Sequence, residues 1–254
     1  MDNISKTSRV NNLKYKFLTF LNKIVDLYTV ETKAYVAGLN EIRKFGKKVK
    51  YLPNEFFSDL VLIDKNIQKE KIFLTVGRLG TEPKNTEMIV SAIENIEPKK
   101  LRDWKVYLVG SMTYDFAKWL NIKLQEKPYL SDVFIITGNI SDKKELYTLY
   151  AKSSVFVLTS RWEGFPLVLP EAMYFGCYPI VTNCFDAVTD IISKSFGKII
   201  ENENIHELQM AIEDVLDEKD AYIDKGKEAS LYVQANFNWY CIVNKLNEYL
   251  KVLK

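Results

Sequence analysis

Short apolar runs rich in β-branched residues alternate with segments of helical pattern from residue 71 to residue 181, and this alternation restricts the fold more than any other feature. Strands that alternate with helices form right-handed βαβ units, which build a parallel sheet covered by helices on both faces. We therefore expect an α/β fold. From residue 203 onward the pattern is helical, with two long amphipathic segments separated at 237–239. The predicted strands are Lys71–Gly77, Lys105–Gly110, Asp132–Thr137, Ser154–Thr159 and Tyr178–Val181, and the predicted helices lie near 85–96, 113–126, 142–151 and 168–175.

The composition is that of an ordinary globular protein, and it argues against several classes of function. The 254 residues are enough to bury one good core with a smaller appended piece. Three cysteines, Cys177, Cys184 and Cys241, lack metal-ligand spacing and leave one unpaired, which indicates a reducing compartment. The single histidine, His206, argues against histidine-based catalysis and multi-histidine metal sites. No apolar run approaches the length of a membrane span and no signal-peptide pattern is present, so we expect a cytoplasmic protein.

The N-terminal part of the chain is basic. Residues 1–70 carry 13 basic and 8 acidic side chains, whereas the remainder carries 22 basic and 25 acidic ones. Apolar residues at positions 13, 17, 20, 21 and 24 form a helical stripe flanked by lysines. A helix within residues 12–28 would either pack on its own domain, which is the commoner outcome, or lie on an anionic membrane surface. Nucleic-acid binding is not supported, because no basic stripe with interleaved aromatic residues recurs elsewhere.

The predicted sheet places several candidate ligand-binding segments at one edge. In sheets of this kind, ligands bind at the carboxyl ends of the strands. Gly77, Gly110 and Gly138 each fall at such an end, and so does the turn that contains Glu163. We therefore expect a single site along this rim.

The most informative stretch for chemistry runs from residue 161 to residue 173. Glu163 and Glu171 stand eight positions apart on either side of a turn built on Gly164 and Pro166, just before a predicted helix. A strand, a tight turn and a helix N-terminus together offer free amides and a positive dipole end to an anion. The alternative is a solvated Glu163 and a Glu171 that only complements the helix dipole. Taken alone, the stretch does not decide between these two interpretations.

A second stretch, from residue 76 to residue 85, adds two cations to the same predicted rim. Gly77 lets the backbone approach a ligand closely, Arg78 offers a planar fork of donors, and Lys84 offers a mobile point charge at a helix start. Two such cations near a helix N-terminus suit a diphosphate. An arginine and a lysine six residues apart are more often merely solvated. The partnership with the two glutamates is what favours a diphosphate site.

Together these residues resemble a known family. Gly77-Arg78-Leu79 with Lys84-Asn85, followed by Glu163-Gly164-Phe165-Pro166-Leu167 with Glu171-Ala172, are similar to the donor-binding half of family-four retaining glycosyltransferases of the GT-B fold. The resemblance covers roughly residues 48–254 and includes Phe237-Asn238-Trp239. It implies a Rossmann-like C-terminal donor-binding domain over 66–254, with the last helices, 203–254, packing back toward the N-terminal part. Residues 1–65 would then be a helical segment and a remnant of the N-terminal domain with its linker.

The resemblance also implies roles for individual residues. Arg78, Lys84 and Glu163 would be catalytic: the two cations would stabilise the departing diphosphate, and Glu163 would contact the transferred sugar. Glu171 would accept hydrogen bonds from the ribose hydroxyls. No metal or other cofactor is implied. The remaining substrate-binding residues would be Gly77 at the phosphates, Gly138, Asn139 and Ile140 near the base, and Gly164, Phe165, Pro166, Leu167 and Val168 in the turn around sugar and phosphate oxygens.

The family likeness implies partners as well. The donor would be a UDP-, GDP- or ADP-sugar, and the acceptor a glycan or a lipid-linked glycan in surface polysaccharide biosynthesis. About 65 residues precede the donor half, too few for a complete acceptor domain, so a partner chain that supplies this domain is expected. Residues 12–28 would give peripheral contact with the inner face of the cell membrane. The chain departs from the family pattern at Met112, at Phe185-Asp186-Ala187 and at Asp190, which leaves the donor pocket plausible and makes acceptor chemistry the open question.

Three functions remain open from the sequence. The leading one is a glycosyltransferase, either as a shortened chain or as a natural short protein with a separate acceptor-binding partner. The second is a module that binds a sugar nucleotide, or scaffolds an assembly, without turnover. The third, a GT-B-like epimerase, is disfavoured because that chemistry also needs a second domain and the chain has only one histidine.

Overall fold

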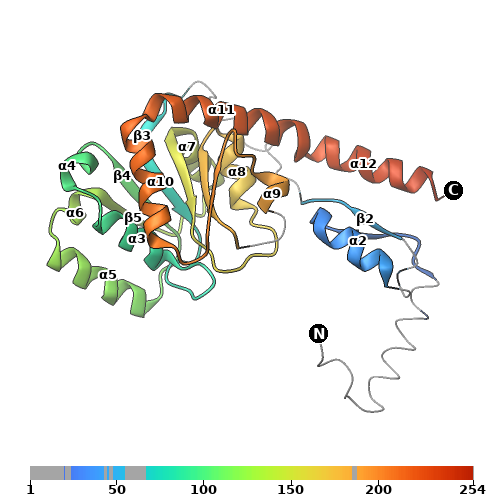
Figure 1. Ribbon diagram of the computed structural model, residues 1–254, viewed down its shortest axis with the longest axis horizontal. Helices are drawn as coiled ribbons and strands as arrows, with labels where there is room; N and C mark the ends of the chain where they lie inside the picture. Colours follow the sequence, from blue (N-terminus) through green and yellow to red (C-terminus); the bar gives the residue numbers. More distant parts are fainter. Residues whose placement is uncertain are drawn as a thin grey trace, which may run out of the picture. The chain divides into compact units, whose positions relative to one another are not determined.

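The computed structural model describes residues 20, 24–42, 45, 48–54, 67–184 and 188–253 (Figure 1). The chain divides into two compact units, one of Met1–Pro53 with Ile242–Lys254 and the other of Asn54–Cys241. The larger unit holds both stretches that the sequence singles out, so it carries the candidate site.

The larger unit is built on a six-stranded sheet in which every neighbouring pair is parallel. The strand order is β5-β4-β3-β6-β7-β8, so the chain first adds strands on one side of β3 and then on the other. This order is that of a doubly wound Rossmann-like sheet. The strands are β3 Glu70–Val76, β4 Lys105–Val109, β5 Phe134–Gly138, β6 Ser153–Leu158, β7 Tyr178–Thr182 and β8 Lys198–Ile200.

Helices cover both faces of this sheet, and successive strand residues alternate between the two cores (Figure 1). In β3, for example, Phe73 packs with one cluster and Leu74 with the other, as the two-residue period of a strand requires. The first face is covered by α3 Thr86–Glu94, α5 Tyr114–Glu126 and α10 Ile205–Asp217. The second face is covered by α7 Lys143–Lys152, α8 Val168–Tyr174, α9 Val188–Ile191 and α11 Lys219–Asn236. The predicted α/β class with helices on both faces is confirmed.

The structure also contains elements that the sequence pattern does not indicate. The strand β8 has only three residues, and the helices α4 Pro98–Leu101, α6 Leu130–Val133 and α9 have four each. Segments this short contain little more than one period of a strand or helix, so their apolar residues cannot be told from loop residues. The strand predicted to begin at Asp132 begins at Phe134 instead, because Asp132 and Val133 end α6.

A close backbone contact holds α11 on the sheet. A Cβ built on Gly226 would lie well inside 3.0 Å of the backbone oxygen of Gly176, and it would also crowd the backbone of Tyr178. Glycine at this position of α11 therefore lets two backbones approach each other. Next to this contact, the Ser230 hydroxyl donates to the carbonyl oxygen of Tyr174 over 2.6 Å.

The smaller unit contains a parallel pair of strands, β1 Tyr28–Val30 and β2 Val49–Tyr51, joined through α2 Lys33–Glu41. The Asn40 side chain both donates to and accepts from the backbone of Val49, each over 3.0 Å. The helix α12, Trp239–Lys251, begins in the larger unit and ends in this one, where the Tyr249 hydroxyl donates to the carbonyl oxygen of Tyr51 over 2.9 Å. Most of the predicted helix within residues 12–28, namely 12–19 and 21–23, lies outside the described residues.

Within the described residues, no helix is both long enough and apolar enough to cross a bilayer.

We predict that Gly226→Ala destabilises the larger unit by about 1–3 kcal/mol, the usual cost of forcing an extra methyl group into a packed site. The group that the new methyl meets is backbone, which cannot move aside as a flexible side chain would. Urea unfolding of the purified protein measures the change. Gly38→Ala is the matched control, because a Cβ on this helical glycine meets nothing within 4 Å. Equal stability of the two variants would contradict the close approach of the Gly226 and Gly176 backbones.

Candidate functional site

The order of the strands determines where a site can form. The order in which the chain adds strands reverses between β3 and β6, so the loops that follow these two central strands lead to opposite faces of the sheet and leave a crevice at the carboxyl ends of the strands. The loop after β3 carries Arg78 and Lys84, and the loop after β6 carries Glu163. Two stretches some 80 residues apart in sequence are therefore brought to the same point of the rim.

Three glycines line this rim at the ends of adjacent strands. The amide of Gly77 donates to the carbonyl oxygen of Val109 over 2.9 Å, and the amide of Gly110 donates to the carbonyl oxygen of Gly138 over 2.8 Å. Gly110 has φ of +136°, and a Cβ there would overlap the carbonyl oxygen of Gly77. No other residue fits this position without displacing the loop after β3.

A cavity of about 280 Å³ opens at these strand ends. Arg78 and Lys84 both line it, and Arg78 is exposed to solvent. The structure thus brings together five of the residues that the sequence predicts: Gly77, Arg78 and Lys84 from the loop after β3, and Asn139 and Ile140 from the loop after β5. The other residues that line the cavity are Val76, Val109, Gly110, Ser111 and Leu146.

Glu163 lies directly against Lys84. The Lys84 ammonium is 2.5 Å from Oε1 of Glu163, and the Ser160 hydroxyl donates to the same oxygen over 2.6 Å. The two charged side chains are only 21% and 13% exposed, so water screens their attraction poorly. The amide of Glu163 donates to the carbonyl oxygen of Cys184, and burial, with Glu163 adding to it, raises the pKa of the Cys184 thiol to about 11. The carboxylate of Glu163 is therefore paired with a cation, while the nearby Cys184 thiol stays un-ionised at neutral pH.

Arg161 and Thr159 tie the loop after β6 to the loop after β3. The amide of Arg161 donates to the carbonyl oxygen of Pro83 and its guanidinium donates to that of Glu82, over 2.8 and 2.7 Å. The Thr159 hydroxyl donates to the carbonyl oxygens of Lys84 and Asn85. These bonds fix the backbone that carries Lys84 against the backbone that carries Glu163.

Glu171 stands in the first turn of α8, and its side chain is 11% exposed. Its Oε1 accepts from the Lys143 ammonium over 3.2 Å, and its Oε2 accepts from the Tyr150 hydroxyl over 3.3 Å. Tyr150 is fully buried, and burial, strengthened by the charge of Glu171, raises the pKa of its hydroxyl well above 10. This hydroxyl therefore stays protonated and remains a donor at any physiological pH.

The turn between the two glutamates does not line the 280 Å³ cavity. None of Gly164, Phe165, Pro166, Leu167 and Val168 belongs to the lining of the 280 Å³ cavity, and neither does Gly138. The Phe165 ring packs 6.1 Å from the ring of Phe237. The helical bonding of α8 begins in this turn, where the amide of Leu169 donates to the carbonyl oxygen of Pro166. Sugar contacts by this turn stay a prediction.

Several residues that shape the site were not singled out from the sequence. They are Ser111 in the cavity wall, Ser160 and Arg161 around Glu163, and Lys143 and Tyr150 at Glu171. Lys143, Tyr147 and Tyr150 recur at helical spacing on α7 and face α8, but the partner of that face cannot be read from spacing alone. Of the departures from the family pattern, Met112 packs against the core, Asp190 lies on α9, and 185–187 lies outside the described residues.

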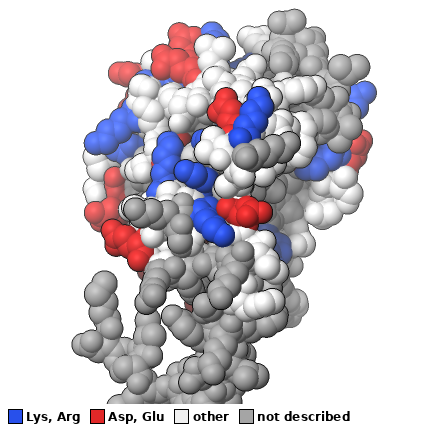
Figure 2. All heavy atoms as spheres, turned by 90° about the vertical axis from the view of Figure 1, so that its right-hand side faces the viewer, with Lys and Arg blue, Asp and Glu red and all other residues white. Residues whose placement is uncertain are grey.

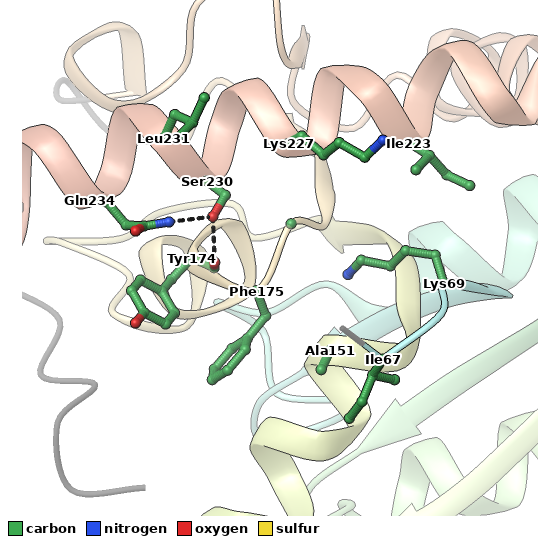
Figure 3. Close-up of a pocket in the computed structure, with 11 residues that line it drawn as sticks. Ile67, Lys69, Ala151, Tyr174, Phe175, Ile223, Lys227, Ser230, Leu231 and Gln234 are labelled. Atoms are coloured by element: carbon green, nitrogen blue, oxygen red, sulfur yellow. Dashed lines mark hydrogen bonds between the residues drawn. The ribbon is translucent and has the colours of Figure 1, made fainter. Parts of the chain in front are cut away.

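A different cavity, of about 330 Å³, lies at the amino ends of the strands, on the opposite edge of the sheet (Figure 3). Its walls are mainly apolar, and Lys69 extends into the same group of side chains. The Lys69 ammonium donates to the carbonyl oxygens of Tyr150 and Ser153, over 3.1 and 2.6 Å, and so caps the C-terminal end of α7. Burial lowers the pKa of Lys69. Lys69 thus stabilises the end of a helix. This cavity shares no lining residue with the 280 Å³ cavity at the carboxyl ends of the strands.

The face of the molecule shown in Figure 2 carries both signs of charge on its described residues. Lys and Arg side chains are interspersed with Asp and Glu on the described part of the face shown in Figure 2. Among the described residues, no group of three or more His, Cys, Asp and Glu side chains is arranged to hold a metal ion.

Comparison with known proteins places the chain in a family. Residues 63–231 match the family described as glycosyl transferases group 1, which is more than half of the chain. The chain therefore belongs to this family of glycosyltransferases.

A relative and two solved structures illustrate the likeness. An α-1,4-N-acetyl-D-galactosaminyltransferase of Campylobacter jejuni, named for an acceptor on PP-undecaprenol, is 28% identical over 78% of this chain and 53% of its own length. HepE of Anabaena in complex with UDP has a TM-score of 0.75 at 17% identity, over 96% of this chain and 68% of that one. The C-terminal domain of a group 1 glycosyl transferase (LpcC) from Francisella tularensis has a TM-score of 0.61 at 23% identity, over 69% of this chain and 90% of that one. The fold is that of GT-B glycosyltransferases, and the chain spans about half the length of the curated relatives.

We predict that Lys84 and Glu163 stabilise the fold as a coupled pair. In a double-mutant cycle with Lys84→Met and Glu163→Gln, we expect a coupling free energy of about 1–3 kcal/mol by urea unfolding, since each single change leaves a half-buried charge unpaired. The matched control is the Lys227–Asp224 pair, whose side chains are 70% and 73% exposed and should couple only weakly. A coupling no larger than that of the control pair would contradict the short contact.

Proposed function

We propose that this chain is the donor-binding half of a family-four retaining glycosyltransferase, which transfers a sugar from a nucleoside diphosphate sugar. The observation that carries the proposal is the meeting of Lys84 with Glu163 at the switch point of the sheet, beside a cavity that Arg78 also lines. Two cations and a carboxylate at one end of a crevice suit a substrate that combines a diphosphate with a sugar. Membership of the glycosyl transferases group 1 family supports the same chemistry.

In this proposal the cations act on the leaving group. When the bond between sugar and diphosphate breaks, negative charge grows on the diphosphate oxygens. Arg78 and Lys84 stabilise this charge, since both already face the cavity and need no large rearrangement. The diphosphate takes the place of Glu163 as the partner of Lys84. Glu163 then accepts hydrogen bonds from the sugar and supports the positive charge that develops at its anomeric carbon.

The base and the ribose of the donor are bound by other residues at the same rim of the sheet. The base lies against Gly138, Asn139 and Ile140, two of which line the cavity, and Glu171 accepts the ribose hydroxyls. Solved neighbours of this fold hold UDP and UDP-glucose, which makes UDP the first nucleotide to test, before GDP and ADP. No metal or other cofactor takes part in the proposed mechanism.

The acceptor is the less specified part of the proposal. A relative from Campylobacter jejuni is named for a glycan on PP-undecaprenol, and a relative from Erwinia amylovora is named for amylovoran biosynthesis. We expect a glycan or lipid-linked acceptor of surface polysaccharide synthesis, used at the inner face of the cell membrane. An acceptor-binding domain, on this protein or on a partner chain, completes the active site.

We predict that Glu171→Ala weakens the binding of a nucleoside diphosphate by about 2–3 kcal/mol, the scale of a lost hydrogen-bond acceptor that carries charge. Calorimetric titration with UDP, GDP and ADP, and then with their sugar conjugates, measures this loss and identifies the base. The matched control is Glu145→Ala, which removes an exposed carboxylate from α7. Unchanged affinity in the Glu171 variant would contradict the proposal that Glu171 binds the ribose hydroxyls. Binding without any turnover, even with an acceptor domain present, would favour a non-catalytic sugar-nucleotide-binding subunit.

We predict that the transferred sugar keeps its α-anomeric configuration. Glu163 lies against Lys84, and in this proposal its carboxylate supports the anomeric centre on the side of the departing diphosphate. Proton NMR of the anomeric centre in the newly formed glycosidic linkage distinguishes the two anomers, with an inverting transferase measured alongside as the control. A β-linked product would contradict the family-four assignment while leaving transferase activity intact.

A further inference from the structure

One oxygen of the Glu171 carboxylate accepts a hydrogen bond from Lys143, which is not one of the residues that carry the family resemblance. The Lys143 ammonium is 3.2 Å from Oε1, while Oε2 is occupied by the buried Tyr150 hydroxyl. Lys143 is the first residue of α7 and follows the loop whose Asn139 and Ile140 line the 280 Å³ cavity. A cation therefore stands beside Glu171 at the end of the site where the base segment begins.

The surroundings of Lys143 hold its ammonium in this position. Its Nζ lies 5.3 Å from the centre of the Tyr147 ring, one helical turn further along α7, and Tyr147 is 4% exposed. Burial alone would lower the pKa of Lys143, but the neighbouring Glu171 carboxylate raises it above the ordinary value. The lysine is therefore charged at neutral pH. Its side chain is still 58% exposed, so one side of the ammonium faces solvent.

A carboxylate oxygen with an ammonium beside it can bind both the hydrogen and the oxygen of a hydroxyl group. A hydroxyl donates one hydrogen bond and accepts others. A sugar hydroxyl that donates to Oε1 of Glu171 comes within reach of Nζ of Lys143, which can donate back to the hydroxyl oxygen. Neither partner alone provides both bonds. A sugar that lacks the hydroxyl leaves both charged groups without this partner, a situation that selects strongly against such an analogue.

We propose that Lys143 is a specificity-determining residue of the donor site, which, with Glu171, selects a ribonucleotide over a deoxyribonucleotide by pairing with a ribose hydroxyl. This inference rests on the proposed function. Lys143 contributes a hydrogen bond to bound substrate and takes no part in breaking the sugar–phosphate bond.

Calorimetric titration tests the proposal with UDP, GDP and ADP, each compared with its 2′-deoxy and 3′-deoxy forms. For the unaltered protein we expect the ribonucleotide to bind more tightly than at least one deoxy form. In Lys143→Met the affinity for the ribonucleotide should fall about 10-fold, the effect of one hydrogen bond to a charged group, and the affinity for that deoxy form should hardly change. Lys143→Arg should restore part of the discrimination.

The neighbouring Lys144 provides the matched control. Lys144→Met removes the same charge from the same helix, but the hydrogen bonds of Lys144 involve its backbone, and the residue is exposed. It should bind every nucleotide as the unaltered protein does. Equal behaviour of Lys143→Met and Lys144→Met, with binding still dependent on Glu171, would overturn the role of Lys143 alone. Failure of all three nucleotides to bind would overturn this role together with the proposed function. Thermal unfolding of each variant shows whether a loss of binding comes from a loss of the fold.

Discussion

The ion pair of Lys84 with Glu163 is the contact on which the arrangement of the site depends, because it joins the loops of the two central strands. Those loops diverge at the point where the strand order reverses, and without a link they would be free to move apart. Side chains and backbone reinforce the pair: Ser160 donates to the same carboxylate oxygen, and Arg161 donates to the backbone of the facing loop. These contacts bring the charged groups of the two loops together before any substrate enters. Such placement suits a reaction that stabilises charge by preorganised groups.

The two-faced core explains how the sheet keeps these loops in register. Alternate residues of β3 and β6 point into separate clusters, so a slip of one residue in either strand would move apolar side chains from one packed layer to the other. The strands β3 and β6 are paired through Phe73 with Val155 and through Leu74 with Phe156, all of them buried. The positions of Arg78, Lys84 and Glu163 at the strand ends are thus fixed by packing well below the rim. The glycine row at Gly77, Gly110 and Gly138 then keeps side chains out of the space above.

The sequence indicates the class of fold and the residues at the rim of the sheet, but it does not indicate the shortest elements or the side chains around Glu171. The physical reasons differ. Buried parallel strands are continuous apolar runs, and β6, buried at every position, is visible as such a run. The three-residue β8 and the four-residue α6 are too short to repeat a period, so the sequence pattern does not indicate them, and it places the start of β5 two residues too early. Arg78, Lys84 and Glu163 could be found because strand ends are where ligands bind. Lys143 and Tyr150 could not, because their importance comes from the orientation of α7 toward α8, which is a tertiary fact.

The two glutamates of the site have different partners, a charged lysine for Glu163 and a buried tyrosine hydroxyl for Glu171. This difference is consistent with different roles in the proposed mechanism. Glu163 is paired with Lys84, a cation that a diphosphate can take over, so its carboxylate becomes available when a donor binds. Glu171 is anchored by Tyr150, a hydroxyl so deeply buried that it neither ionises nor moves toward solvent. An exchangeable partner suits a carboxylate that must meet a changing charge at the reacting carbon. A permanent partner suits one that only orients the nucleotide. Eight residues of sequence therefore separate two carboxylates of the same chemistry whose surroundings give them different roles in the proposed mechanism.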